Sequence, residues 1–165
     1  MAHNRAVPGS FGEVYELARA CVCLRSARPA LQDDDLAQGC CNMRLVVIML
    51  GGAAGALLRY GVSTWALRWF GHGFADGTLL VNLAGCLLIG LAFGIGEQRG
   101  LNPLFRLMFI TGFLGALTTF STYGLETVNH AALGLTRVAL INIIVQNVCG
   151  LLLVRCGIWL AQRLG

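Results

Sequence analysis

The sequence predicts an all-α membrane protein with four transmembrane helices, the third of them broken near the membrane midplane. Of its 165 residues, 56% are hydrophobic and only 12% are charged, and the mean hydropathy is +0.70. A soluble domain averages about 25% charged residues, so this composition indicates a membrane protein. Four apolar segments follow residue 43. Each approaches or exceeds the roughly 20 residues that a helix needs to cross the hydrocarbon.

Residues 1–42 differ from everything after them. They carry the acidic run Asp33-Asp34-Asp35 and contain no apolar run long enough to span a bilayer. Met43, followed by Arg44 and an apolar run, looks like a natural beginning. We therefore expect residues 1–42 to be a disordered or dispensable tail, and residues 43–165 to form a four-helix membrane domain.

The first two apolar segments each contain one costly polar residue. The first, about 45–67, includes the small-residue run Gly51–Ala56, which suits close helix contact, and then Arg59. A buried arginine should pair, reach the interface or face water. The second segment, about 78–95, holds Asn82 one turn from its start. A lone asparagine needs hydrogen-bond partners, so Asn82 either joins two helices or lines a polar pore.

The third segment, about 104–132, is rich in hydroxyls and glycines where leucine and valine would be ordinary. Its hydroxyl residues stand almost in a row: Thr118, Thr119, Ser121 and Thr122. This pattern suits either a helix interrupted at membrane depth, which frees backbone groups to meet an ion, or a polar packing face. In the fourth segment, about 136–159, Asn142 and Gln146 are four residues apart and share a helix face.

Charge and motif content exclude several classes of function. The net charge of +4 comes from arginine alone, which suggests anionic lipid headgroups as partners and no nucleic acid. The arginine bias between the two sides is weak, so membrane orientation is poorly specified. We find no Cys-x-x-Cys pair, no histidine at zinc-ligand spacing and no catalytic triad pattern. The sequence therefore does not predict an enzyme.

Three motifs occur in a characteristic order: Gly51-Gly52-x-x-Gly55-Ala56-x-x-Arg59-Tyr60, Gly77-Thr78-Leu79-x-Val81-Asn82-x-x-Gly85 and Gly112-Phe113-x-Gly115-x-x-Thr118-Thr119-Phe120-Ser121-Thr122. Together they resemble the CrcB/Fluc family of small fluoride channels, over about Met43 to Gly165. The resemblance implies a fluoride-specific channel that lowers cytoplasmic fluoride by passive export across the inner (plasma) membrane. It also implies an antiparallel, dual-topology homodimer with two pores.

The resemblance further implies a structural sodium ion at the centre of that dimer. Its ligands would be the backbone carbonyls of Gly115 and Thr118. The second-helix asparagine of the family corresponds to Asn82, which would line the pore. The arginine after the first glycine motif corresponds to Arg59, near an aqueous vestibule. Glu126 matches a common family glutamate whose part in permeation is uncertain.

The two pore phenylalanines of the family correspond to Phe120 and Tyr123, and position 123 departs from the commoner phenylalanine. Tyrosine keeps the ring and its electropositive edge and adds a hydroxyl. A pore must replace the water around fluoride with hydrogen-bond donors. The chain offers the Asn82 amide, the hydroxyls of Ser121 and Thr122, and ring edges. Because residues 120 and 123 share a helix face, they form either an anion site or ordinary aromatic packing.

Two other functions remain open. One is a small four-helix secondary transporter of the multidrug-resistance type, which would need a membrane-embedded acid to couple protons. Glu126 is the only acid in the four segments. The other is a helical subunit that transports nothing and packs against larger partners.

Overall fold

The computed structural model describes residues 34–70 and 77–164 of the chain. The chain divides into two units, 1–45 and 46–165, and the helix packing below concerns the second unit. Helix α2 begins at Asp34 and ends at Phe70, so residues 34–42 of the predicted tail are helical. Residues 1–33 lie outside the described part, and the expectation that 1–42 is dispensable stays a prediction.

Within the described residues, four helical stretches are long and apolar enough to cross a membrane: Asn42–Trp69, Gly77–Arg99, Pro103–Ala132 and Thr136–Leu164. The first belongs to α2, and the second is α3 (Gly77–Arg99). Four spans were predicted and four are found, so this part of the prediction is confirmed. Each span extends a few residues beyond the apolar segment read from the sequence, because helices continue into polar flanks.

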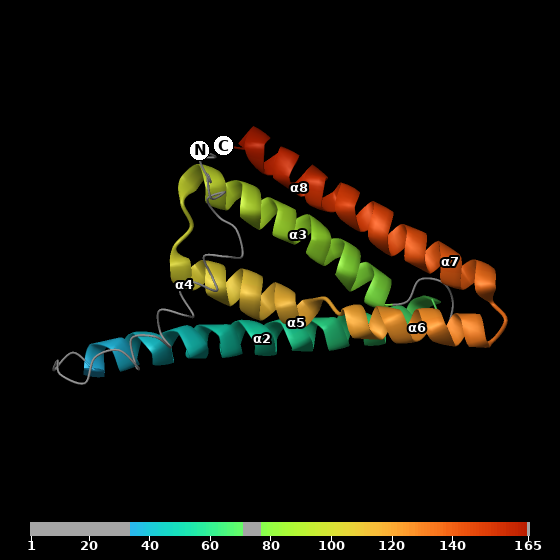
Figure 1. Ribbon diagram of the computed structural model, residues 1–165, viewed down its shortest axis with the longest axis horizontal. Coiled ribbons are helices and arrows are strands. Elements are labelled where there is room, and N and C mark those ends of the chain that lie inside the picture. The colour runs from blue at the N-terminus through green and yellow to red at the C-terminus, as the bar shows by residue number, and fades with distance from the viewer. Residues whose placement is uncertain (1–33, 71–76, 165) are drawn as a thin grey trace, which may run out of the picture. The chain divides into compact units, whose positions relative to one another are not determined.

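The third span is interrupted at its middle, as predicted. It consists of α4 (Pro103–Arg106), the π-helix η1 (Leu107–Leu114), the short α5 (Gly115–Leu117) and α6 (Phe120–Ala132). Between α5 and α6, Thr118 (φ −86°, ψ 150°) and Thr119 (φ −147°, ψ 114°) are extended. Two consecutive β-branched residues favour that conformation. Figure 1 shows the chain stretching out between α5 and α6.

The fourth span contains a π-helical segment that the sequence did not predict. It runs through α7 (Thr136–Ile144), η2 (Val145–Cys149) and α8 (Gly150–Leu164). A π-helix bonds each N–H to the fifth residue back, and such segments often occur at functional sites. Here η2 carries Gln146 and Asn147, whose side chains both contact the region around the break. The helical periodicity of the sequence did not reveal either π-segment.

Glycines bring α2 and η1 into backbone contact, which confirms the predicted role of the small-residue run. Gly51 and Gly55 are buried, and a Cβ on either would collide with backbone atoms of Met108 or Phe113. Reciprocally, a Cβ on Gly112 would lie 2.7 Å from a backbone oxygen of α2. Contacts advance in the same direction along both helices, so α2 and η1 run parallel. Close backbone approach of this kind holds membrane helices together by van der Waals packing.

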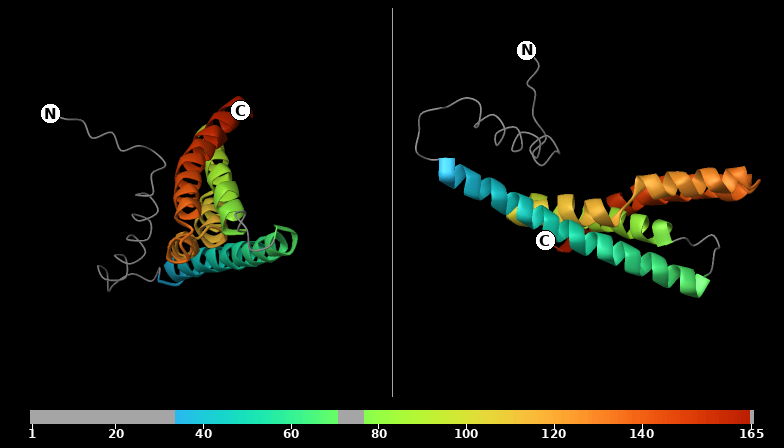
Figure 2. Two further views of the ribbon diagram at one scale, coloured as in Figure 1. Left: turned by 90° about the vertical axis from the view of Figure 1, so that its right-hand side faces the viewer. Right: turned by 90° about the horizontal axis from the view of Figure 1, so that it is seen from below.

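A second glycine seam joins α3 to α8. Gly90 and Gly94 of α3 face α8, and a Cβ on Gly157 would lie 2.5 Å from the Leu87 carbonyl oxygen. The two helices run side by side and parallel in Figures 1 and 2. At their far ends, Arg99 Nη2 donates to the Leu164 carbonyl at 2.9 Å. These two seams fix the register in which polar groups of different spans meet.

The buried core of the second unit is small. Val81, Leu114 and Leu117 form its centre, at the level where α3 meets the third span. Many large apolar side chains lie outside it, such as Leu57 at 71% and Leu151 at 73% exposed. An apolar exterior of this kind suits lipid or a second protein surface, because neither requires the chain to bury those groups itself.

Candidate ion site at the break in the third span

The side chain of Asn82 holds the break through three hydrogen bonds. Its Oδ1 accepts from the Thr119 backbone N–H at 2.9 Å, and its Nδ2 donates to the Thr119 carbonyl at 3.3 Å. The same Nδ2 donates to Gln146 Oε1 at 2.8 Å. Asn82 therefore replaces the helical partner of the Thr119 N–H and adds a second donor to the Thr119 carbonyl, which as the N-cap carbonyl of α6 also accepts the first bond of that helix. The structure thus brings the second, third and fourth spans together at one amide.

The break frees the two carbonyls that the family resemblance points to. In a continuous helix the Thr119 N–H would bond the Gly115 carbonyl, but it bonds Asn82 Oδ1 instead. Likewise the Thr122 N–H would bond the Thr118 carbonyl, but it donates to Thr119 Oγ1 at 3.4 Å. Both carbonyl oxygens thereby lose their helical donors. Such oxygens are hard ligands of the kind that bind alkali and alkaline-earth cations.

Thr118 packs against the same α3 motif that contains Asn82. Its methyl group lies against Gly85, where a Cβ would leave no room for it. Its backbone N–H and its hydroxyl both donate to the Leu114 carbonyl, at 3.1 and 3.0 Å, near the end of the first half-helix. Asn82 and Gly85 are three residues apart and share a face of α3. This spacing lets one helix face bind both residues of the break.

Thr119 caps the second half-helix and gathers a group of hydroxyls. Its Oγ1 lies 3.1 Å from Ser121 Oγ and 3.2 Å from Thr122 Oγ1. Ser121 is exposed and Thr122 is half-buried. A threonine at a helix N-cap is a common pattern, because its side-chain oxygen accepts from an N–H of the first turn. The capping role of Thr119 was not predicted, although threonine is a common N-cap residue and the sequence shows it in the hydroxyl run.

The two aromatic residues predicted to share a face do so. The rings of Phe120 and Tyr123 have centroids 5.4 Å apart and an interplanar angle of 64°, an edge-to-face arrangement. Phe120 is 82% exposed, so apart from this contact its ring contributes little to the buried core of the chain. An exposed ring edge carries a partial positive charge, which an anion can approach.

A ladder of polar side chains continues from the break along α6 and the fourth span. Gln146 Nε2 donates to Asn142 Oδ1 at 3.4 Å, and Asn142 Nδ2 donates to Thr127 Oγ1 at 2.9 Å. Thr127 in turn donates to the Tyr123 carbonyl at 2.8 Å. The shared face predicted for Asn142 and Gln146 is confirmed. Thr127 was missed, because a single threonine in a helix interior usually bonds its own backbone.

Two further predicted residues are Glu126 and Arg59. Glu126 Oε1 accepts a hydrogen bond from Thr78 Oγ1 at 2.6 Å, across α6 and α3. Thr78 is buried and Glu126 half-buried. Arg59 is half-buried on α2, one turn beyond Gly55. Among the described residues no hydrogen bond joins Arg59 to the break, whereas Asn82 bonds Thr119 directly.

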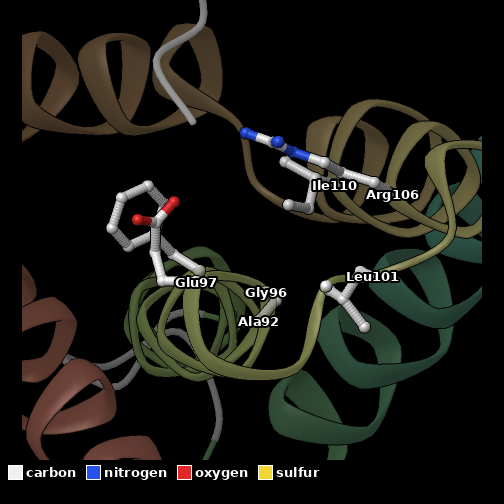
Figure 3. Close-up of a pocket in the computed structure, with 8 residues that line it drawn as sticks. Ala92, Gly96, Glu97, Leu101, Arg106 and Ile110 are labelled. Atoms are coloured by element: carbon white, nitrogen blue, oxygen red, sulfur yellow. The ribbon is translucent and has the colours of Figure 1, made fainter. Parts of the chain in front are cut away.

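The described residues hold no group of three or more His, Cys, Asp and Glu side chains that would bind a metal. A hollow of about 170 Å³ lies elsewhere, at the opposite end of α3 from Asn82. Figure 3 shows Glu97 and Arg106 on either side of it. Because that hollow is remote from the hydroxyls and the rings, it is not part of the ion site.

Comparison with known proteins points to one family. A family model described as "CrcB-like protein, Camphor Resistance (CrcB)" matches residues 46–158. A protein of Maridesulfovibrio salexigens named "Fluoride-specific ion channel FluC" is 42% identical over 120 residues, covering 72% of this chain and 95% of that protein. A protein of the same name from Parabacteroides distasonis is 36% identical over 122 residues, covering 74% and 95%. Another, from Chloroflexus aurantiacus, is 40% identical over 122 residues, covering 73% and 97%.

Proposed function

The chain belongs to the CrcB family, and on that premise we propose that it is a fluoride-specific ion channel that lowers cytoplasmic fluoride by passive export. With four membrane-spanning helices, it is a multi-pass protein of the plasma membrane. The names of its relatives favour a channel over a multidrug-type transporter. The observation that carries the proposal is the set of hydroxyls and ring edges assembled at the break in the third span.

Fluoride can cross only where donors replace its water. Ser121 and Thr122 supply hydroxyl protons, and the exposed edge of Phe120 supplies a weaker positive surface. Asn82 shapes this path by holding the extended backbone at Thr119. Its Nδ2 proton toward Gln146 can turn to an ion that displaces the Gln146 amide. Asn82 thus lines the pore and maintains it.

We propose that two copies of the chain enclose the pores as an antiparallel homodimer. Ser121 and Asn147 are exposed on helices that cross the membrane, and Phe120 is 82% exposed beside them. Polar side chains facing lipid are costly, so this surface must meet water or protein. A second copy of the same surface would enclose the aromatic and polar groups together. The weak arginine bias would let one sequence insert in both orientations, and lipid would cover the remaining apolar exterior.

A sodium ion fits the carbonyls that the break releases. Gly115 and Thr118 would each contribute one oxygen, and two copies would contribute four. A bound sodium would add a fixed positive charge at the centre of the assembly, which favours an anion nearby. No acidic side chain is needed to hold it, so no carboxylate repels fluoride there. Arg59, near a vestibule, would draw fluoride toward the pore. Glu126, held by Thr78, would border the path at its other end.

Fluoride efflux from liposomes that contain only the purified chain tests this proposal. We expect voltage-driven fluoride efflux without a proton gradient, and far slower chloride efflux from the same vesicles. A fluoride electrode measures the first and a chloride electrode the second. Efflux that requires a proton gradient would instead indicate the transporter, and the absence of fluoride efflux from intact dimers would contradict the channel.

A further inference from the structure

The tyrosine at position 123 has a partner of its own in the fourth span. Asn147 Nδ2 donates to the Tyr123 hydroxyl oxygen at 3.1 Å and to the Ile143 carbonyl at 2.8 Å. Tyr123 is half-buried and Asn147 exposed, so the pair lies at the surface that holds Phe120. The pair joins α6 to η2 at the point where the polar ladder reaches the aromatic rings.

The direction of these hydrogen bonds follows from the chemistry of the groups. The Ile143 carbonyl can only accept, so the Asn147 atom facing it must be the amide nitrogen. That nitrogen can only donate, so the Tyr123 oxygen accepts from it. The phenolic proton is therefore not used by Asn147 and remains free to donate elsewhere. Both described contacts of Nδ2 are to protein acceptors, so Asn147 acts through Tyr123 and not on an ion directly.

From this geometry, and resting on the proposed fluoride path, we infer that Asn147 is a positioning residue and Tyr123 a specificity-determining donor. Asn147 fixes the rotamer of the Tyr123 side chain through its hydroxyl oxygen. The fixed ring meets Phe120 edge to face, 5.4 Å between centroids. The phenolic proton then points into the polar surface beside Phe120 and donates to the passing fluoride. A phenylalanine at 123 would offer the ring edge alone.

A hydroxyl donor would favour fluoride over larger halides. The O–H···anion bond is strongest for the smallest, most charge-dense acceptor, and charge-assisted bonds are roughly twice as strong as neutral ones. The free energy gained from this hydrogen bond depends on the orientation of the Tyr123 side chain, because a freely rotating tyrosine would lose conformational entropy on binding the ion. Asn147 removes part of that loss in advance. The two residues therefore form one functional unit whose effects on transport should not be additive.

The test compares Tyr123→Phe, Asn147→Leu and the double variant with the parent, by fluoride efflux from liposomes at matched amounts of intact dimer. Leucine matches asparagine closely in size but cannot donate. We expect the half-saturating fluoride concentration to rise about tenfold in Tyr123→Phe, as for the loss of one hydrogen bond to a charged group. Asn147→Leu should raise it several-fold, and the double variant should match Tyr123→Phe. Val148→Leu, at the neighbouring exposed position, controls for a changed helix surface and should behave like the parent.

The half-saturating concentration separates positioning from folding, because a partly misfolded sample loses maximal rate and keeps its half-saturation. An unchanged half-saturation in Tyr123→Phe would overturn the donor role of the hydroxyl. Effects of the two single variants that multiply in the double variant would overturn the positioning role of Asn147. If the parent itself passes no fluoride, the proposed function fails. If the parent conducts and all variants match it, only this inference fails.

Discussion

Replacing Asn82 with leucine should collapse the break in the third span. The change removes the partner of the Thr119 N–H, one of the donors to the Thr119 carbonyl and the bond to Gln146. Leaving a backbone N–H without a partner costs about 1–3 kcal/mol, and in Asn82→Leu this cost falls on the Thr119 N–H alone, because the Thr119 carbonyl keeps its donor in α6. A regular helix through the break would give that N–H the Gly115 carbonyl as its acceptor and so withdraw this carbonyl from an ion. Even the lower figure reduces the population of the broken form by roughly fivefold.

Two measurements on the purified Asn82→Leu protein test whether the break in the third span has collapsed. Fluoride efflux should fall by at least that factor while the dimer persists on size-exclusion chromatography. The Tm of the parent should rise when sodium replaces a large organic cation, and Asn82→Leu should lose this dependence because the carbonyl ligands are withdrawn. Asn102→Leu is the matched control, since Asn102 Oδ1 accepts only from the exposed Leu104 N–H at 2.9 Å. That cap is worth about 1 kcal/mol, so the control should keep both flux and sodium dependence.

An Asn82→Leu dimer that keeps parental efflux and a sodium-dependent Tm would contradict the role of Asn82 in holding the break. Efflux lost with the sodium dependence intact would leave Asn82 as a direct fluoride ligand and not the residue that holds the break.

Three further changes test other parts of the site. Deleting residues 1–42 should leave dimer assembly and fluoride efflux intact, because that stretch has no apolar run able to span a bilayer; a truncated dimer that inserts but does not conduct would contradict this. Phe120→Ile should cut efflux severely at matched dimer, although a volume-conserving apolar swap usually costs under about 1.5 kcal/mol of stability; parental efflux would exclude the ring edge as a contact. Gly85→Ala should lower the Tm and the efflux, because the new methyl group meets the Thr118 side chain and overpacking costs about 1–3 kcal/mol. Gly61→Ala is the control and should be neutral, because a Cβ at Gly61 has nothing within 4 Å. If the two variants behave alike, the contact between Gly85 and Thr118 does not position Thr118.

Much of the candidate site could be predicted from the sequence, because it depends on interactions between residues close together in the chain. Hydroxyls in a row inside an apolar segment suited either a break or a polar packing face, and the family resemblance favoured the break; β-branched residues favour the extended backbone found there. The spacing of Phe120 and Tyr123 predicts a shared face, and the structure confirms it. The π-helical turns at η1 and η2 could not be predicted from the sequence, because the apolar pattern there fits an α-helix as well.

The four spans and the glycine seam of α2 could be predicted from the sequence, as could the place of the break once the family resemblance had decided between a break and a polar packing face. Each of these depends on hydrophobicity, side-chain size or backbone preference within a few neighbouring residues. The polar groups that meet could not be predicted in this way: Asn82 bonds Thr119 and Gln146, and Asn147 bonds Tyr123. Those pairings depend on the register between helices that are far apart in the chain. Backbone contacts at the glycine seams set that register, and a shift of one residue would turn each amide to another face.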